Sequence, residues 1–203
     1  MDPFLQNIAV LLLASFPVCM YAYPNGLVTG SCVSMIPSHG ASAQTSSPPY
    51  TLSLNKNTYS AGERITVTLG GGTQFKGFLI QARSGSSTVP VGSFVTSNSN
   101  MQTLTCTSAA SSVSHTSGSG KSSIVVTWVA PTSNITDIQI RATVVQSEYV
   151  FWTNVISAKI AYTNVTSNAS ISQPNGSSPI LQHTWTLEES FLSFAIVMVS
   201  FLA

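Results

Sequence analysis

Apolar and polar residues alternate in short runs from residue 50 onward. In residues 64–72, RITVTLGGG, an isoleucine, a valine and a leucine alternate with polar residues and lead into three glycines. This period of two is typical of a strand with one buried face, and the glycines indicate where it ends. Residues 122–131, SSIVVTWVAP, form the most apolar run. Pro131 ends that strand, because proline donates no hydrogen bond to a sheet.

Two further runs show the same alternation. In residues 76–83, KGFLIQAR, one face holds Phe78, Ile80 and Ala82, and the other holds Leu79, Gln81 and Arg83. In residues 137–145, DIQIRATVV, the apolar face consists of Ile138, Ile140, Ala142 and Val144. Other strand patterns occupy residues 50–54, 90–94, 101–106, 111–115 and 155–162. Short strands separated by turn residues, without an amphipathic helix, predict an all-β fold built as an antiparallel β-sandwich.

The N-terminus has the pattern of a secretory signal peptide. Residues 8–18 are mostly apolar and are followed by small and aromatic residues. A run of about 11 apolar residues is too short to span a bilayer, which needs roughly 20. We therefore expect residues 1–22 to be removed after Ala22, so that Tyr23 starts a mature domain over residues 23–162.

The C-terminus has the pattern of a glycolipid attachment signal. Residues 163–190 form a polar Ser/Thr/Asn-rich stalk and spacer, which we expect to be disordered, and residues 191–203 form a hydrophobic tail. A short terminal tail after small residues predicts a GPI anchor, attached at Asn175 or Gly176. The alternative is the truncated membrane segment of a longer protein. Either reading predicts a protein that is secreted or held on the extracellular face of the plasma membrane, through the tail or a glycolipid.

Composition supports an extracellular domain. Only 6% of the chain is charged, so hydroxyl groups and sugars have to supply much of its solubility. The Asn-X-Ser/Thr sequons at Asn134, Asn164, Asn168 and Asn175 are candidate glycosylation sites. Asn175 cannot carry both a sugar and the anchor.

The mature domain is mildly basic. All seven basic residues lie between Lys56 and Lys159, where the only acids are Glu63, Asp137 and Glu148. The basic residues occur singly, without the cluster that nucleic acids require. We therefore expect no nucleic-acid partner.

The cysteines predict one disulfide. Cys19 leaves with the signal peptide, so the mature chain keeps Cys32 and Cys106. Two cysteines in an oxidising compartment form a disulfide most simply. It would close a loop of about 75 residues, stabilise the fold by about 4 kcal/mol, and tie the irregular residues 23–49 onto the sandwich.

Residues 31–40, SCVSMIPSHG, leave a metal site open as an alternative. Cysteine, Met35 and His39 are residue types that ligate copper or zinc. A zinc site from the two cysteines, His39 and His115 is numerically possible. Export favours the disulfide, and we predict no metal and no cofactor. His39 before Gly40 is then expected at a turn, and Met35 in a gap of the core.

No catalytic residues are predicted. A nucleophile needs a base and a group that orients the base. The only candidate bases in the domain are His39 and His115, and Glu63, Asp137 and Glu148 are the only carboxylates that could orient them. No spacing links these residues, and no nucleophile elbow or metalloprotease motif is present.

The ordered blocks of the mature chain resemble a known family. The blocks are CVSMIPSHG, YSAGERITVTLGG, FKGFLIQAR, VGSF, LTC, VSHTSGSGKSSIVVTWVAP and VFWTNVISA. Over about residues 23–162 they look like a reeler (reelin-type) domain. Such domains occur in reelin, F-spondin, ferric-chelate reductase 1 proteins and free-standing insect defence proteins. The resemblance implies an immunoglobulin-like β-sandwich, although Trp128 follows both cysteines, whereas a strict immunoglobulin domain has its tryptophan between them.

The resemblance favours a binding module over an enzyme. In the ferric-chelate reductases, electron transfer is attributed to a DOMON domain and to haem-binding transmembrane helices, and this sequence contains neither. We expect a non-catalytic module that recognises an extracellular protein, the matrix or a microbial surface. The alternative is a short isoform or accessory of a reductase. Tyr149, Phe151 and Trp152 are the candidate interaction surface, with core packing as their alternative role.

Overall fold

The computed structural model describes residues 23–164. The predicted signal peptide, residues 1–22, lies outside the described residues, as do Asn168, Asn175, Gly176 and the C-terminal tail. Within the described part of the chain, no helix has the length and hydropathy that a membrane span requires.

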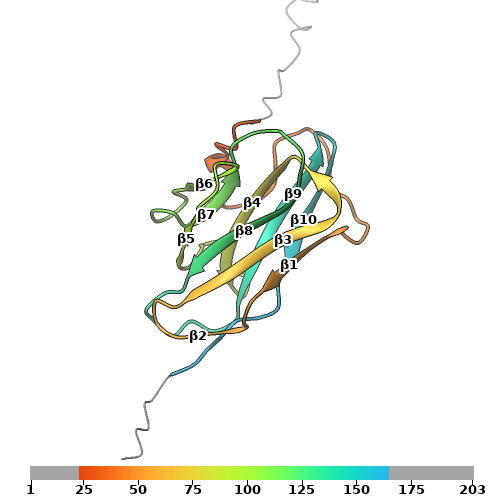
Figure 1. Cartoon of the computed structure of the whole chain (residues 1–203). Coiled ribbons are helices and arrows are strands. Elements are labelled where there is room, and N and C mark those ends of the chain that lie inside the picture. The colour runs from red at the N-terminus through yellow and green to blue at the C-terminus, as the bar shows by residue number, and fades with distance from the viewer. Residues whose placement is uncertain (1–22, 165–203) are drawn as a thin grey trace, which may run out of the picture. The chain divides into compact units, whose positions relative to one another are not determined.

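Two antiparallel sheets form the domain (Figure 1). One has the order β1 (Tyr50–Leu54), β3 (Arg64–Phe75), β8 (Lys121–Val129) and β5 (Ser93–Val95). The other has the order β10 (Val150–Ile156), β9 (Ile138–Ser147), β4 (Gly77–Ser84), β7 (Ser112–His115) and β6 (Met101–Leu104). A parallel pair of β2 (Thr58–Tyr59) and β11 (Ala161–Tyr162) completes the strands. The predicted all-β sandwich is confirmed.

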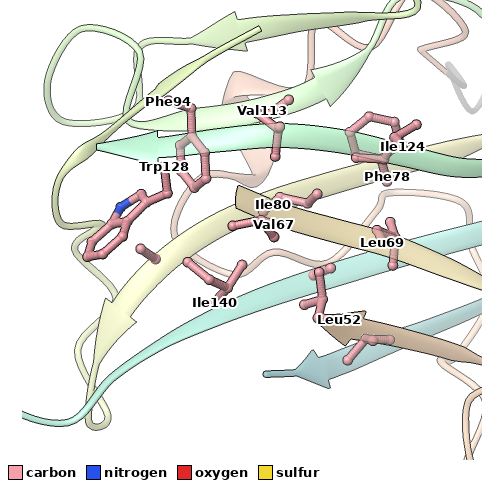
Figure 2. Packing of buried hydrophobic residues seen from close by; sticks show 14 of the residues in the cluster. Leu52, Val67, Leu69, Phe78, Ile80, Phe94, Val113, Ile124, Trp128 and Ile140 are labelled. Carbon is pink, nitrogen blue, oxygen red and sulfur yellow. The ribbon is translucent and has the colours of Figure 1, made fainter. Parts of the chain in front are cut away.

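The core lies between the two sheets, as the alternation predicts. In β3, Ile65, Val67 and Leu69 are fully buried. They pair in register with Trp128, Val126 and Ile124 of β8, so both strands turn the same kind of face inward. Figure 2 shows Val67, Leu69 and Ile124 from this sheet on the same core as Phe78, Ile80 and Ile140 from the other sheet. Complete burial stabilises the fold by about 1.5–3 kcal/mol for each large apolar side chain.

Strand β4 is buried on both faces. Phe78 and Ile80 face the core, but Leu79, Gln81 and Arg83, on the opposite face, are also less than 6% exposed. A strand at the surface of a two-layer sandwich normally exposes alternate residues. A third layer therefore covers this face of the sheet, and the next section describes it.

The last strands differ from their predicted positions. A strand is predicted at residues 155–162, whereas β10 covers Val150–Ile156 and β11 covers only Ala161–Tyr162. The pairing of β10 with β9 shifts register between Trp152 and Val155, and Asn154 takes a left-handed conformation with φ 62°. This bulge breaks the period of two, which explains why the alternation did not reveal the first half of β10.

Candidate ligand-binding pocket

Residues 23–49, here called the N-terminal segment, form the layer over the outer face of β4 (red to orange in Figure 1). Their one helical element is a 3-10 turn at Thr29–Ser31. The predicted disulfide between Cys32 and Cys106 is present, with the two Cα atoms 5.5 Å apart. It joins this segment to the loop between β6 and β7.

Buried polar side chains of the sheet hold the segment. Arg83 Nη2 donates hydrogen bonds to the carbonyl oxygens of Cys32 (2.7 Å) and Val33 (3.0 Å). Gln81 Nε2 donates to the same Cys32 oxygen at 3.0 Å, and the Thr143 hydroxyl donates to the Met35 oxygen. Burial lowers the pKa of Arg83, and the nearby charge of Arg141 lowers it further. Hydrogen bonds from a charged donor are stronger than neutral ones, so Arg83 is the main polar clamp.

The approach of the segment to β7 is close enough to require glycine at position 26. Gly26 has φ 69°, and a Cβ atom there would lie 1.8 Å from the backbone oxygen of His115. Any side chain would therefore both strain the backbone and collide with β7.

Met35 sits in a small second core under the segment. It packs with Leu79 and Leu104, with Val28 partly buried beside them. This confirms the prediction that Met35 fills a gap of the core. Its backbone is left-handed, with φ 55°, a conformation that costs a non-glycine residue about 1–3 kcal/mol.

A pocket of about 280 Å³ lies between the N-terminal segment and the five-stranded sheet. Val28, Met35, Leu79 and Val145 supply much of its apolar lining. The remaining lining residues are Tyr23, Pro24, Ser31, Pro37, Ser38, His39, Lys76, Gly77, Phe78, His115, Gly118, Thr143, Ser147 and Glu148. The pocket brings together His39 and His115, which the sequence spacing did not link.

His115 connects the pocket wall to the sheet. Its Nδ1 accepts a hydrogen bond from the Phe78 N–H at 3.2 Å, and its Nε2 donates to the Tyr23 oxygen at 3.2 Å. This pairing fits the neutral ring with its proton on Nε2. Burial lowers the pKa of His115, and the positive charges of Lys121 and His39 act in the same direction.

His39 lines the pocket from the N-terminal segment, whereas His115 lines it from β7 of the sheet. Its ring meets the edge of Phe151 at a centroid distance of 6.0 Å, and its Nδ1 is buried without a hydrogen-bond partner. Gly40 follows with φ 67°, so the predicted turn is present. The alternative zinc site does not fit, because both cysteine sulfurs are joined in the disulfide. Among residues 23–164, no three His, Cys, Asp or Glu residues are grouped closely enough for a metal.

Only one of the three candidate carboxylates reaches the pocket. Glu63 pairs with Lys56, whose hydrogen bond is the main cause of its lowered pKa. Asp137 pairs with Lys159 at 2.7 Å. Glu148 lines the pocket but makes no ion pair within the described residues.

The proposed aromatic interaction surface is wrong for two of its three residues. Phe151 is fully buried, and Trp152 is 7% exposed, with Nε1 donating to the Ser46 oxygen at 3.1 Å. Only Tyr149, in the turn before β10, is exposed, at 63%. Phe151 and Trp152 lie in β10, where they pack between the sheet and its neighbouring layers.

Of the four sequons, Asn134 and Asn164 lie within the described residues, and both are exposed. Glycosylation requires an exposed asparagine, which both residues are, and the attachment of sugars to them stays a prediction.

Sequence reasoning did not identify the sheet residues that hold the N-terminal segment over the pocket. Gln81 and Arg83 look like the solvent face of an alternating strand, and Thr143 lies on the neighbouring strand β9, paired with Leu79. The predicted disulfide did indicate that the N-terminal segment contacts the domain, because a cross-link to Cys106 requires the segment to pass close to that residue.

Comparison with known proteins gives a consistent result. The Reeler domain family matches residues 30–168. Ferric-chelate reductase 1 of Mus musculus is 38% identical over 184 residues, which cover 87% of this chain and 31% of that protein. Defense protein l(2)34Fc of Drosophila melanogaster is 34% identical over 155 residues, which cover 74% of this chain and 96% of that protein. The chain thus spans less than a third of the reductase but nearly all of the defence protein.

A solved structure shows the same fold. The crystal structure of the human F-spondin reeler domain (fragment 2) superposes with a TM-score of 0.53 at 17% sequence identity, covering 65% of this chain and 99% of that chain. The family match extends over most of the described residues, and the sandwich has the family's architecture. This chain therefore belongs to the Reeler domain family.

Proposed function

We propose that the protein is a non-catalytic recognition module that acts outside the cell. The family match is to the Reeler domain. Among residues 23–164, no histidine is hydrogen-bonded to a carboxylate that would orient it as the base for a nucleophile. His115 uses both ring nitrogens to hold backbone, which leaves it no lone pair for proton transfer.

One observation carries the proposal. The N-terminal segment exposes four large apolar side chains: Tyr23 (51%), Leu27 (53%), Val33 (66%) and Ile36 (53%). Contiguous apolar patches are typical of interaction surfaces, and these four side chains all belong to residues 23–36 of one segment. The disulfide and Arg83 hold this segment in place, which reduces the entropy lost on binding.

A microbial surface is the first partner to test. The Drosophila defence protein is matched over 96% of its length, so a domain of this size stands alone in that protein. The mild excess of basic residues would favour the acidic polymers of such surfaces. An extracellular protein or matrix component is the other class of partner.

The test compares two triple variants of the secreted protein. In the first, Leu27, Val33 and Ile36 are changed to serine. In the second, the matched control, Val89, Val95 and Val125, which are 52%, 44% and 52% exposed, are changed to serine. We expect the first to reduce binding to bacteria about tenfold or more, equivalent to about 1.4 kcal/mol, and the control to retain it. Equal binding by all three proteins would contradict the proposal.

A role beside a ferric-chelate reductase is a second candidate, favoured by the 38% identity to the mouse protein. It predicts bound haem, iron or copper in protein purified from cells. Elemental analysis and the absorbance near the haem Soret band distinguish it from a pure recognition module.

We further propose that the chain is exported, glycosylated and held on the cell surface by a GPI anchor at Asn175 or Gly176. Phospholipase release from expressing cells, followed by intact mass, tests this arrangement. The mass gives both ends of the mature chain and the sugars attached to it. A released protein that starts at Tyr23 is the expected result, and protein that resists the phospholipase would contradict the anchor.

A further inference from the structure

We propose that the pocket beneath the N-terminal segment is a binding site for a small, uncharged, mostly apolar molecule that carries one hydrogen-bonding group. This goes beyond the proposed recognition function, which concerns the exposed side of the same segment. A small ligand in the pocket and a large partner on the surface can be measured separately.

The size of the pocket sets the size of the ligand. Its volume is about 280 Å³. Small-molecule sites usually measure about 300–1,000 Å³, so this one suits a ligand of one or two rings, or a short aliphatic chain. A long acyl chain or a sugar polymer is too large.

The walls favour an apolar body. Val28 and Met35 come from the segment, and Leu79 and Val145 come from β4 and β9. A methionine thioether makes favourable contacts with aromatic rings and adapts to different shapes. The strained backbone of Met35 also marks this position as one that the surrounding structure holds in place at a cost.

The charges around the pocket favour an uncharged ligand. Lys76 and Glu148, which have opposite signs, both line it, so neither an anion nor a cation gains from both. Neither residue forms a salt bridge among the described residues. Both side chains are exposed and stay hydrated, so a charged ligand would lose its own hydration against the apolar walls without gaining a buried partner of opposite charge.

One lining residue offers a polar contact. His39 Nδ1 is buried with no hydrogen-bond partner in the described structure. A buried polar atom without a partner costs about 1–3 kcal/mol. The His39 ring has to turn for this atom to face the pocket, where a hydroxyl or amide group on the ligand would supply its partner. His115 is already occupied by Phe78 and Tyr23.

The first test is calorimetry at pH 8. The probe is 1-naphthol, with 1-naphthoate and 1-naphthylmethylamine as its anionic and cationic analogues. We expect 1-naphthol to bind saturably with one site and the two charged analogues to bind at least about tenfold more weakly. Absence of saturable binding, or equal binding of all three compounds, would overturn the proposal.

A pair of variants then places the ligand. Val145→Trp fills the pocket, and Val125→Trp adds the same side chain at an exposed position of β8 that does not line it. We expect the first variant to lose 1-naphthol binding and the second to keep it. Retained binding in a folded Val145→Trp protein would place the ligand elsewhere and reject this site.

A second measurement covers the case in which Val145→Trp does not fold. Within residues 23–164, the methionines are Met35, which lines the pocket, and Met101, which packs in the main core and does not line it. In the unmodified protein labelled at its methionine methyl groups, 1-naphthol should shift the Met35 signal and leave the Met101 signal in place. A shift of Met101 alone, or of neither, would contradict the proposal.

Discussion

His115 joins two chain segments that are 92 residues apart in the sequence. Histidine suits this role because its neutral ring both accepts and donates a hydrogen bond. It receives the Phe78 N–H on one side and donates to the Tyr23 oxygen on the other. The sequence marked His115 as a candidate base or metal ligand, but the structure uses it to attach the N-terminal segment.

The lowered pKa of His115 predicts a loss of stability in mild acid. Its ordinary value is 6.5, and burial and the charges of Lys121 and His39 lower it in the folded state. Near and below pH 6.5, the unfolded chain binds more protons at His115 than the folded chain does, so the free energy of unfolding decreases as pH falls. Well above pH 6.5, His115 is neutral in both states and its contribution to stability is fully present. Urea titrations from about pH 7.5 to pH 5 should show this decrease.

The matched variants for this prediction are His115→Gln and His39→Gln. The first should have a smaller pH dependence than the unmodified protein across this interval, because the group with the lowered pKa is gone. The second should keep most of the dependence. Parallel slopes for His115→Gln and the unmodified protein would assign the effect to other groups.

Lys121 is a buried cation with a structural role. It is 7% exposed, and its Nζ donates to the carbonyl oxygens of Lys76 (3.0 Å), Ser117 (2.7 Å) and Ser119 (2.8 Å). We expect Lys121→Met to lower the free energy of unfolding by about 1–3 kcal/mol, because three carbonyls lose their donor. Lys159→Met removes an exposed ion pair and should cost less than about 1 kcal/mol. Equal effects in urea denaturation would contradict this assignment.

Among the strands, those with strict alternation could be predicted and those with irregular pairing could not. The predicted range of β1 agrees with Tyr50–Leu54, and β4, β8 and β9 lie within a few residues of their predicted ranges. The prediction that the three glycines end β3 is wrong, because the strand continues through them to Phe75. The two residues of β2 are too few to show a period. In β10, whose pairing with β9 is irregular, Trp152 packs in the main core and Phe151 is buried against His39 of the N-terminal segment.

The N-terminal segment contains too little regular structure to hold its position without the cross-link. We expect the Cys32→Ser/Cys106→Ser protein to lose about 4 kcal/mol of unfolding free energy, as estimated for a loop of this length. Hydrogen exchange should speed up over residues 23–49, while amides of β3 and β8 stay protected. Unchanged exchange in the segment would show that Arg83 and Gln81 suffice to hold it.

At the scale of the molecule, the fold class and the cross-link could be derived from the sequence, but the pocket could not. Alternation specifies which residues enter a sheet-to-sheet core, and an even number of cysteines in an exported chain specifies a disulfide. The path of an irregular segment depends on side-chain hydrogen bonds between residues far apart in the chain, such as Arg83 to Cys32. No local pattern records such contacts, so the pocket between segment and sheet appeared only in three dimensions.

The enclosure of β4 on both faces has a consequence for mutational tolerance. Every position from Gly77 to Arg83 is buried, so none of them behaves as a surface site that accepts arbitrary replacements. In a saturation library sorted for display of folded protein, Gln81 should reject nearly all substitutions, while Gln139 and Gln146, which are only partly buried, accept many. Gln81, which the sequence pattern predicts to be an ordinary surface residue, would then be among the residues of the domain that tolerate the fewest substitutions.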